Sequence, residues 1–120
     1  MVAADQPDYP AGELKHLLAV RAEHFATEQA VHLLRQAITV GDTARISAGV
    51  TAAIDSVHQL ATVAAAPPDN KESTQLRTQL HARQDSFHEA HKQGDTDGVT
   101  GHGELVGDAV MNYAYFLANL

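Results

Sequence analysis

Residues 40–68 read VGDTARISAGVTAAIDSVHQLATVAAAPP and carry the pattern that decides the fold. The stretch opens with a Gly-Asp-Thr triplet at 41–43, in which a helix-ending glycine is followed by an aspartate that caps the next helix. It closes at Pro67-Pro68, because proline cannot continue a helix. Between the two breaks one amphipathic helix is predicted, because apolar residues recur every three or four positions, at Ile46, Val50, Ala53, Val57, Leu60 and Ala64.

Three further helices are predicted around this one. A second Gly-Asp-Thr triplet at 94–96 repeats the first break, and the segments between breaks are rich in good helix formers. The first helix should run from about Ala11 to Val40. In the fourth, glycines at 98, 101, 103 and 107 predict an irregular first turn, with regular helix from about residue 102. The first helix has a wide apolar stripe made of Leu14, Leu17, Leu18, Phe25, Val31, Leu34 and Ile38.

The connections between the predicted helices are all short. Short connections place consecutive helices antiparallel to one another. The expected fold is therefore all-α: an antiparallel up-down-up-down four-helix bundle. We expect residues 1–120 to form a single helical-bundle domain, of which residues 1–10 are an N-terminal extension.

Composition limits the function. The chain has 120 residues and 44 % apolar residues, but alanine accounts for 21 of these, which predicts a thin core of small side chains. A net charge of −7 argues against nucleic acid as a partner, and the lack of cysteine excludes thiol chemistry. No apolar run approaches the ~18 residues of a membrane span, and the first dozen residues have no signal-peptide pattern. We expect a cytoplasmic protein that binds neither nucleic acid nor membranes.

Eight histidines are the most unusual feature of the sequence. His24, Glu28 and His32 follow one another at four-residue steps and so share one helix face. Arg83 interrupts the apolar stripe of the third helix, and His102 that of the fourth. Counting residues from the turns places these polar groups in the middle third of the bundle.

Two kinds of ligand fit this cluster. A small ligand, anionic because of the nearby arginines, would be bound by Glu28, His32, Arg83 and His102. A divalent transition metal would take His24, Glu28, His58 and His102, because bundles hold metals with imidazoles and carboxylates from facing helices. The alternative is that these side chains only pair with one another and leave no site for a ligand or a metal.

The C-terminal segment combines acidity with apolar character. No Lys or Arg follows Lys92, and after Asp108 the chain is strongly apolar. On a helical wheel Met111 and Tyr115 point away from the core-facing positions. We therefore expect Met111, Tyr115 and Phe116 to contact another chain, and a two-fold homodimer is the simplest arrangement.

No set of residues has the pattern of a catalytic site. There is no glycine-rich phosphate loop and no serine in a nucleophile-elbow motif, which favours a protein without enzymatic activity. The sequence thus predicts a small binding module that acts through protein–protein contact, as a regulator or an accessory subunit. Two alternatives stay open: a metal- or small-ligand-binding bundle, and a small enzyme that uses a histidine of the interior cluster as acid or base.

Overall fold

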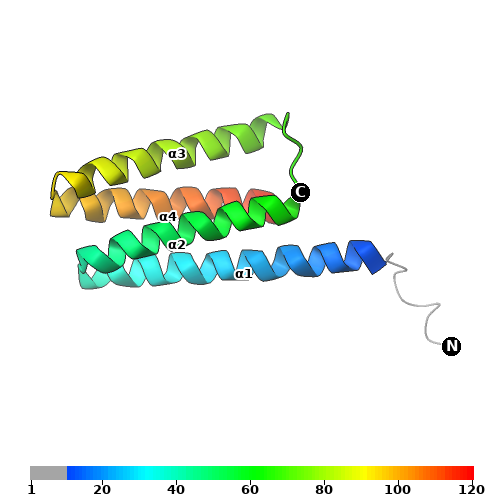
Figure 1. The fold of residues 1–120 in the computed structure, drawn as a ribbon, viewed down its shortest axis with the longest axis horizontal. Helices are drawn as coiled ribbons and strands as arrows, with labels where there is room; N and C mark the ends of the chain where they lie inside the picture. Colours follow the sequence, from blue (N-terminus) through cyan, green and yellow to red (C-terminus); the bar gives the residue numbers. More distant parts are fainter. Residues whose placement is uncertain (1–10) are drawn as a thin grey trace.

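The computed structural model describes residues 11–120, in which every regular element is a helix (Figure 1). The four helices are α1 (Ala11–Val40), α2 (Thr43–Ala64), α3 (Lys71–Lys92) and α4 (Thr96–Ala118). The prediction of an all-α, four-helix fold is confirmed for this part of the chain. The predicted extension 1–10 lies outside the described residues. Within 11–120, no helix is long and apolar enough to cross a membrane.

Three of the helices begin at a capping side chain. The Asp42 carboxylate accepts a hydrogen bond from the Arg45 backbone N–H, and Asp95 accepts one from Gly98, at 3.2 and 3.0 Å. The side-chain oxygen of Asn70 does the same at the start of α3. Such caps satisfy backbone donors that the first turn of a helix leaves free. The two Gly-Asp-Thr triplets therefore act as the sequence predicts.

α4 is the central helix. It packs against α1, α2 and α3, whereas α1 also packs against α2, and α3 packs closely only against α4. The 41–42 and 93–95 turns lie at one end of the bundle, and the α2–α3 connection lies with the C-terminus at the other (Figure 1). The arrangement is thus a cluster of α1, α2 and α4, with α3 added on the remaining side of α4.

Gly103 lets α4 approach α2 closely, whereas a side chain at Gly107 would meet its neighbours at ordinary contact distance. A Cβ atom at Gly103 would lie 3.1 Å from Cγ2 of Ile46, and one at Gly107 would lie 3.6 Å from Cδ2 of Leu34. The expectation of an irregular start to this helix is wrong, since α4 is regular from Thr96. Glycine is unfavourable inside a helix, and close packing against α1 and α2 offsets this cost.

The core matches the predicted stripe of α2, because all six of its residues are buried. The stripe predicted for α1 divides instead. Val31 and Leu34 are buried, but Leu14, Leu17, Leu18 and Phe25 are exposed. α1 has 30 residues against 22 in α2, and its first eight residues are all exposed. Figure 1 shows this end of α1 projecting beyond the other helices.

Candidate functional site

The four predicted small-ligand residues lie on three different helices. Glu28 and His32 line a recess of about 460 Å³ between α1 and α4, together with Arg35. Arg83 and His102 are not part of the recess, whose remaining lining residues are Gln29, Val31, Met111 and Tyr115. Arg83 belongs to α3, which packs on α4 and not on α1. The structure therefore assembles half of the predicted set.

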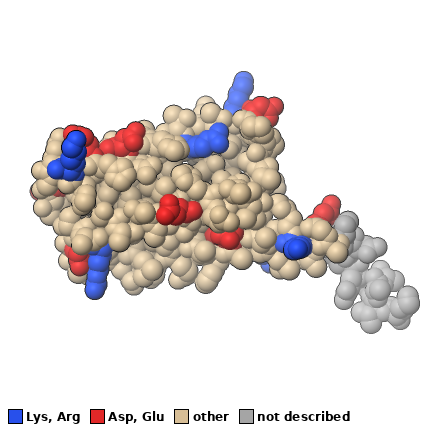
Figure 2. All heavy atoms as spheres, viewed as in Figure 1, with Lys and Arg blue, Asp and Glu red and all other residues tan. Residues whose placement is uncertain are grey.

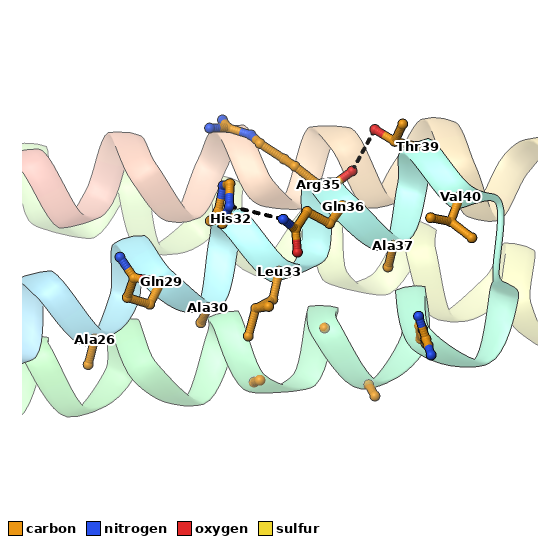
Figure 3. Close-up of a pocket in the computed structure, with 14 residues that line it drawn as sticks. Ala26, Gln29, Ala30, His32, Leu33, Arg35, Gln36, Ala37, Thr39 and Val40 are labelled. Carbon is orange, nitrogen blue, oxygen red and sulfur yellow. Dashed lines mark hydrogen bonds between the residues drawn. The ribbon is translucent and has the colours of Figure 1, made fainter.

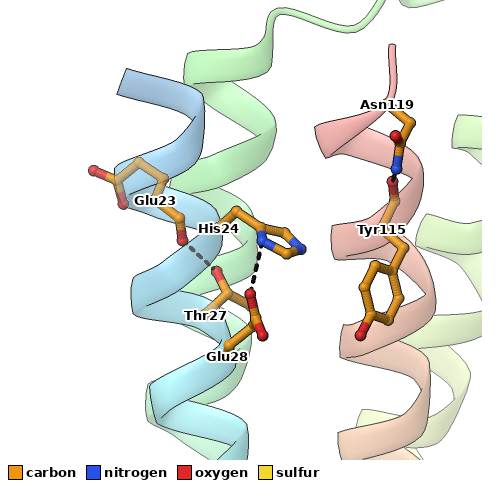
Figure 4. Close-up of polar contacts among 6 residues, drawn as sticks. All are labelled: Glu23, His24, Thr27, Glu28, Tyr115 and Asn119. Atoms are coloured by element: carbon orange, nitrogen blue, oxygen red, sulfur yellow. Dashed lines mark hydrogen bonds and ion pairs between the residues drawn. The ribbon is translucent and has the colours of Figure 1, made fainter. Parts of the chain in front are cut away.

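His24 and Glu28 form the main polar contact near this recess (Figure 4). Nδ1 of His24 lies 2.9 Å from Oε1 of Glu28, one helical turn further along α1. The imidazole also packs against Tyr115 of α4, with ring centroids 5.6 Å apart. Its Nε2 is buried and has no hydrogen-bond partner among the described residues.

His58 meets another histidine, not the α1 cluster. Its ring stacks on that of His81 across the α2–α3 boundary, with centroids 5.8 Å apart. Burial lowers the pKa of His58 below 6.5, and the charges of His81 and Arg77 lower it further. Asp55 acts in the opposite direction. His58 is thus held toward its neutral form.

The predicted metal ligands do not converge. Within residues 11–120, no three His, Asp or Glu side chains lie close enough together to hold a metal ion. His24 and Glu28 are neighbours, but His58 stacks on a histidine of α3. His102 is half-buried, and its Nδ1 is buried without a partner in the described part of the chain.

The three predicted interface residues of α4 have different environments. Met111 is 9 % exposed and belongs to the core, and Phe116 is half-buried against it. Tyr115 is 55 % exposed. Because α4 is surrounded by three helices of its own chain, most of its second apolar face is already covered.

An exposed apolar face lies instead on α1, where the sequence analysis did not separate it from the core. Six large apolar side chains of α1 are between 47 % and 69 % exposed, and five of them share one face. With three intervening exposed positions these five form a row, named here the outer face of α1: Leu14, Leu18, Ala22, Phe25, Gln29, Leu33, Gln36 and Val40. The exposed side chains of Lys15 and His32 lie on the same side of the helix.

Helix geometry places this row opposite the core. At about 100° per residue, the eight positions fall within an arc of about 100°. The buried residues Val20, Val31 and Leu34 lie on the other side of the helix. A signal for the outer face was present in the sequence, because the positions repeat in steps of three and four over the whole helix.

A groove runs beside the C-terminal half of the outer face, between α1 and α2 (Figure 3). Its volume is about 1120 Å³. Leu33 and Val40 stand on the α1 side, and Arg35 and Arg45 also line it. Small residues occupy much of the lining: Ala26, Ala30, Ala37, Ala48, Gly49 and Ala52. Small residues allow another helix to approach closely.

Charge is unevenly divided among the helices. α1 carries three acidic and three basic residues, and α2 carries one of each, so both are neutral overall. α4 has three acidic residues and no Lys or Arg. In the view of Figure 2 the charged side chains are scattered, without a block of one sign. α1 and α2 thus have no net charge, although Arg35 and Arg45 line the groove between them.

No protein-family model, curated protein or solved structure matches this chain.

Proposed function

We propose that this chain is a helical-bundle binding module that acts through protein–protein contact, without catalytic activity of its own. Its helices follow an up-down-up-down order, with consecutive helices antiparallel, as their short connections favour. The docking surface is the outer face of α1. The observation that carries the proposal is the row of exposed large apolar side chains along that helix.

The row is more than the scattered exposure that is normal for a folded chain. Single apolar residues on a surface need no explanation, but contiguous patches mark interaction sites. Fully burying one such side chain stabilises by about 1.5–3 kcal/mol, so half-exposed ones add roughly 1 kcal/mol each. Five of them together offset much of the association cost of about 4–15 kcal/mol.

Photo-crosslinking in cells that naturally produce the protein tests this proposal. A benzophenone amino acid at Phe25 should form covalent adducts with protein, whether a second copy or another chain. The same group at Gln79, which is exposed on α3, should form few or none. Lysines at Leu18 and Leu33 should abolish the adducts, because charges on the outer face oppose its burial. If position 25 gives no more adducts than position 79, the proposal is refuted.

A second candidate function is supported by the α1–α4 recess. Glu28, His32 and Arg35 line it, and the unpartnered Nε2 of His24 lies nearby. These groups suit a small ligand with both anionic and hydrogen-bonding parts. Against it, Arg35 already pairs with Asp108, at 3.3 Å. A thermal shift with phosphate or a small dicarboxylate that is lost in Arg35→Gln would favour this function, and no shift with either compound would count against it.

A further inference from the structure

We infer that the partner on the outer face of α1 is a second copy of this chain. The two α1 helices lie antiparallel, related by a two-fold axis at the level of residue 27. This inference rests on the proposed function and names the occupant of the docking surface. It is carried by the symmetry of the row, by the projecting end of α1 and by the charge of the helix.

The row matches its own reverse. When the two-fold axis lies at residue 27, each residue of one α1 helix lies beside the residue of the other whose number brings the sum of the two to 54. Leu14 then meets Val40 of the partner subunit at both ends of the contact.

Inside these ends, large side chains meet smaller or flexible ones. Leu18 lies level with Gln36, and Phe25 with Gln29. Ala22 lies level with His32, and Leu33 lies level with Arg21, one residue from Ala22. Alternation of large and small residues lets two helix faces interdigitate without voids, so the row suits an antiparallel copy of itself.

The projecting end of α1 supplies the second argument. Residues 11–18 are exposed throughout, although three of them are leucines. In the antiparallel pair, this end extends over residues 36–43 of the other copy. There the α1–α2 groove is lined by Gln36, Ala37, Val40 and Arg45. Leu14 and Leu18, which lie beyond the core of their own bundle, thus gain cover from Val40 and Gln36 of the other copy, twice over by symmetry.

Charge supplies the third argument. The whole chain carries −7, so two copies repel one another on average. α1 has no net charge, and Lys15 is the one charged residue on the side of its outer face, so contact there brings no block of like charges together. α4, with three acidic residues and no Lys or Arg, would instead suit a basic partner.

Sedimentation equilibrium of the purified protein tests self-association. We expect a dimer at micromolar concentration. Leu18→Lys with Leu33→Lys should weaken it at least about 100-fold, because each copy then places two charges in the contact. Both positions are exposed, and Lys favours helix as Leu does, so circular dichroism should stay helical. The matched control, Thr78→Lys with Gln79→Lys, puts two charges on exposed positions of α3 and should leave the dimer intact.

Disulfide formation tests the orientation, because the native chain has no cysteine. Leu18→Cys protein mixed with Gln36→Cys protein should give a mixed disulfide dimer, since bridged Cα atoms lie about 4.4–6.8 Å apart. Leu18→Cys alone should not crosslink. In the antiparallel pair the two copies of position 18 are 18 residues apart along the helix axis, which at 1.5 Å per residue places their sulfurs about 27 Å apart. Self-crosslinking of Leu18→Cys would overturn the antiparallel arrangement.

A monomeric mass at 200 µM concentration would overturn the second-copy inference. Failure here and failure of the proposed function are distinguishable. If the purified protein is monomeric but position 25 still crosslinks to a different protein in cells, the outer face docks a partner of another sequence. If position 25 crosslinks to nothing, the proposed function fails as well.

Discussion

α4 and α1 both carry apolar side chains on two sides, but they differ in what covers the second side. α4 lies between three helices, so Met111 is buried within its own chain. Among the described helices α1 packs closely only against α2 and α4, and its outer face is left exposed. A helix that is apolar on two sides is normally covered on two sides. The comparison shows that α1, not α4, lacks a cover within the described chain.

The largest expected effect comes from a substitution in the buried part of α4. Met111→Asp places a carboxylate among core residues near Glu28, with which it shares the lining of the recess. We expect the free energy of unfolding to fall by about 2–4 kcal/mol, since a buried charge lacks compensation. Tyr115→Asp, on the exposed neighbouring position, should cost less than about 1 kcal/mol. Urea denaturation of the two variants measures the difference, and equal losses would contradict the burial of Met111.

A smaller effect tests why α4 can occupy the centre. Gly103→Leu should lower the free energy of unfolding by about 1–2 kcal/mol, because its Cβ already approaches Ile46 and overpacking is destabilising. Gly101→Leu is the matched control, as no atom lies within 4 Å of a Cβ there. It should raise stability by about 0.5–1 kcal/mol through helix propensity. Stabilisation by both changes would show that close packing at 103 is absent.

A still smaller effect is expected on the α1 side. Leu33→Lys, measured at a concentration where the protein is monomeric, should change the free energy of unfolding by no more than about 0.5 kcal/mol, because the side chain is exposed. Leu34→Lys, one position along, should cost several times more, since Leu34 is fully buried. Comparable losses in these two variants would mean that the outer face is packed inside the chain.

The smallest effect concerns the boundary between α2 and α3, where His58 stacks on His81. The pKa of His58 is lowered by burial and by His81, so the unfolded chain binds more protons than the folded one. Its stabilising contribution is complete above pH ~6.5 and is lost as the pH falls from there toward the folded-state pKa. The melting temperature should therefore be lower at pH 5.5 than at pH 7.5. His58→Asn should reduce this pH dependence. An unchanged pH dependence in this variant would contradict the role given to His58.

Much of the fold could be predicted from local signals. The glycine–aspartate breaks mark the ends of α1 and α3, because a left-handed glycine and a capping carboxylate act within a few residues. The α2 stripe was identified correctly for a similar reason: only one of its faces is apolar.

Tertiary arrangement could not be predicted in the same way. The sequence pattern places Phe25 and Val31 in one wide stripe of α1, yet they lie on different sides of the helix. Periodicity shows that a residue can be buried but not which neighbouring helix buries it. On a helical wheel Met111 points away from the predicted core. In the structure α4 packs against three helices and Met111 is buried, and no local sequence pattern encodes these contacts. The predicted metal cluster assumed a regular bundle, in which His58 would face α1 and not His81.

Hydrogen exchange of α1 at several protein concentrations tests the central claim most directly. Residues 11–18 have no cover from their own bundle, so their backbone amides should exchange rapidly in the monomer. The account predicts that protection of this segment rises with protein concentration from 1 to 200 µM, while α3 is unchanged. Rapid exchange at every concentration, or concentration-dependent protection of α3 in place of α1, would contradict the claim that the outer face of α1 docks a second copy.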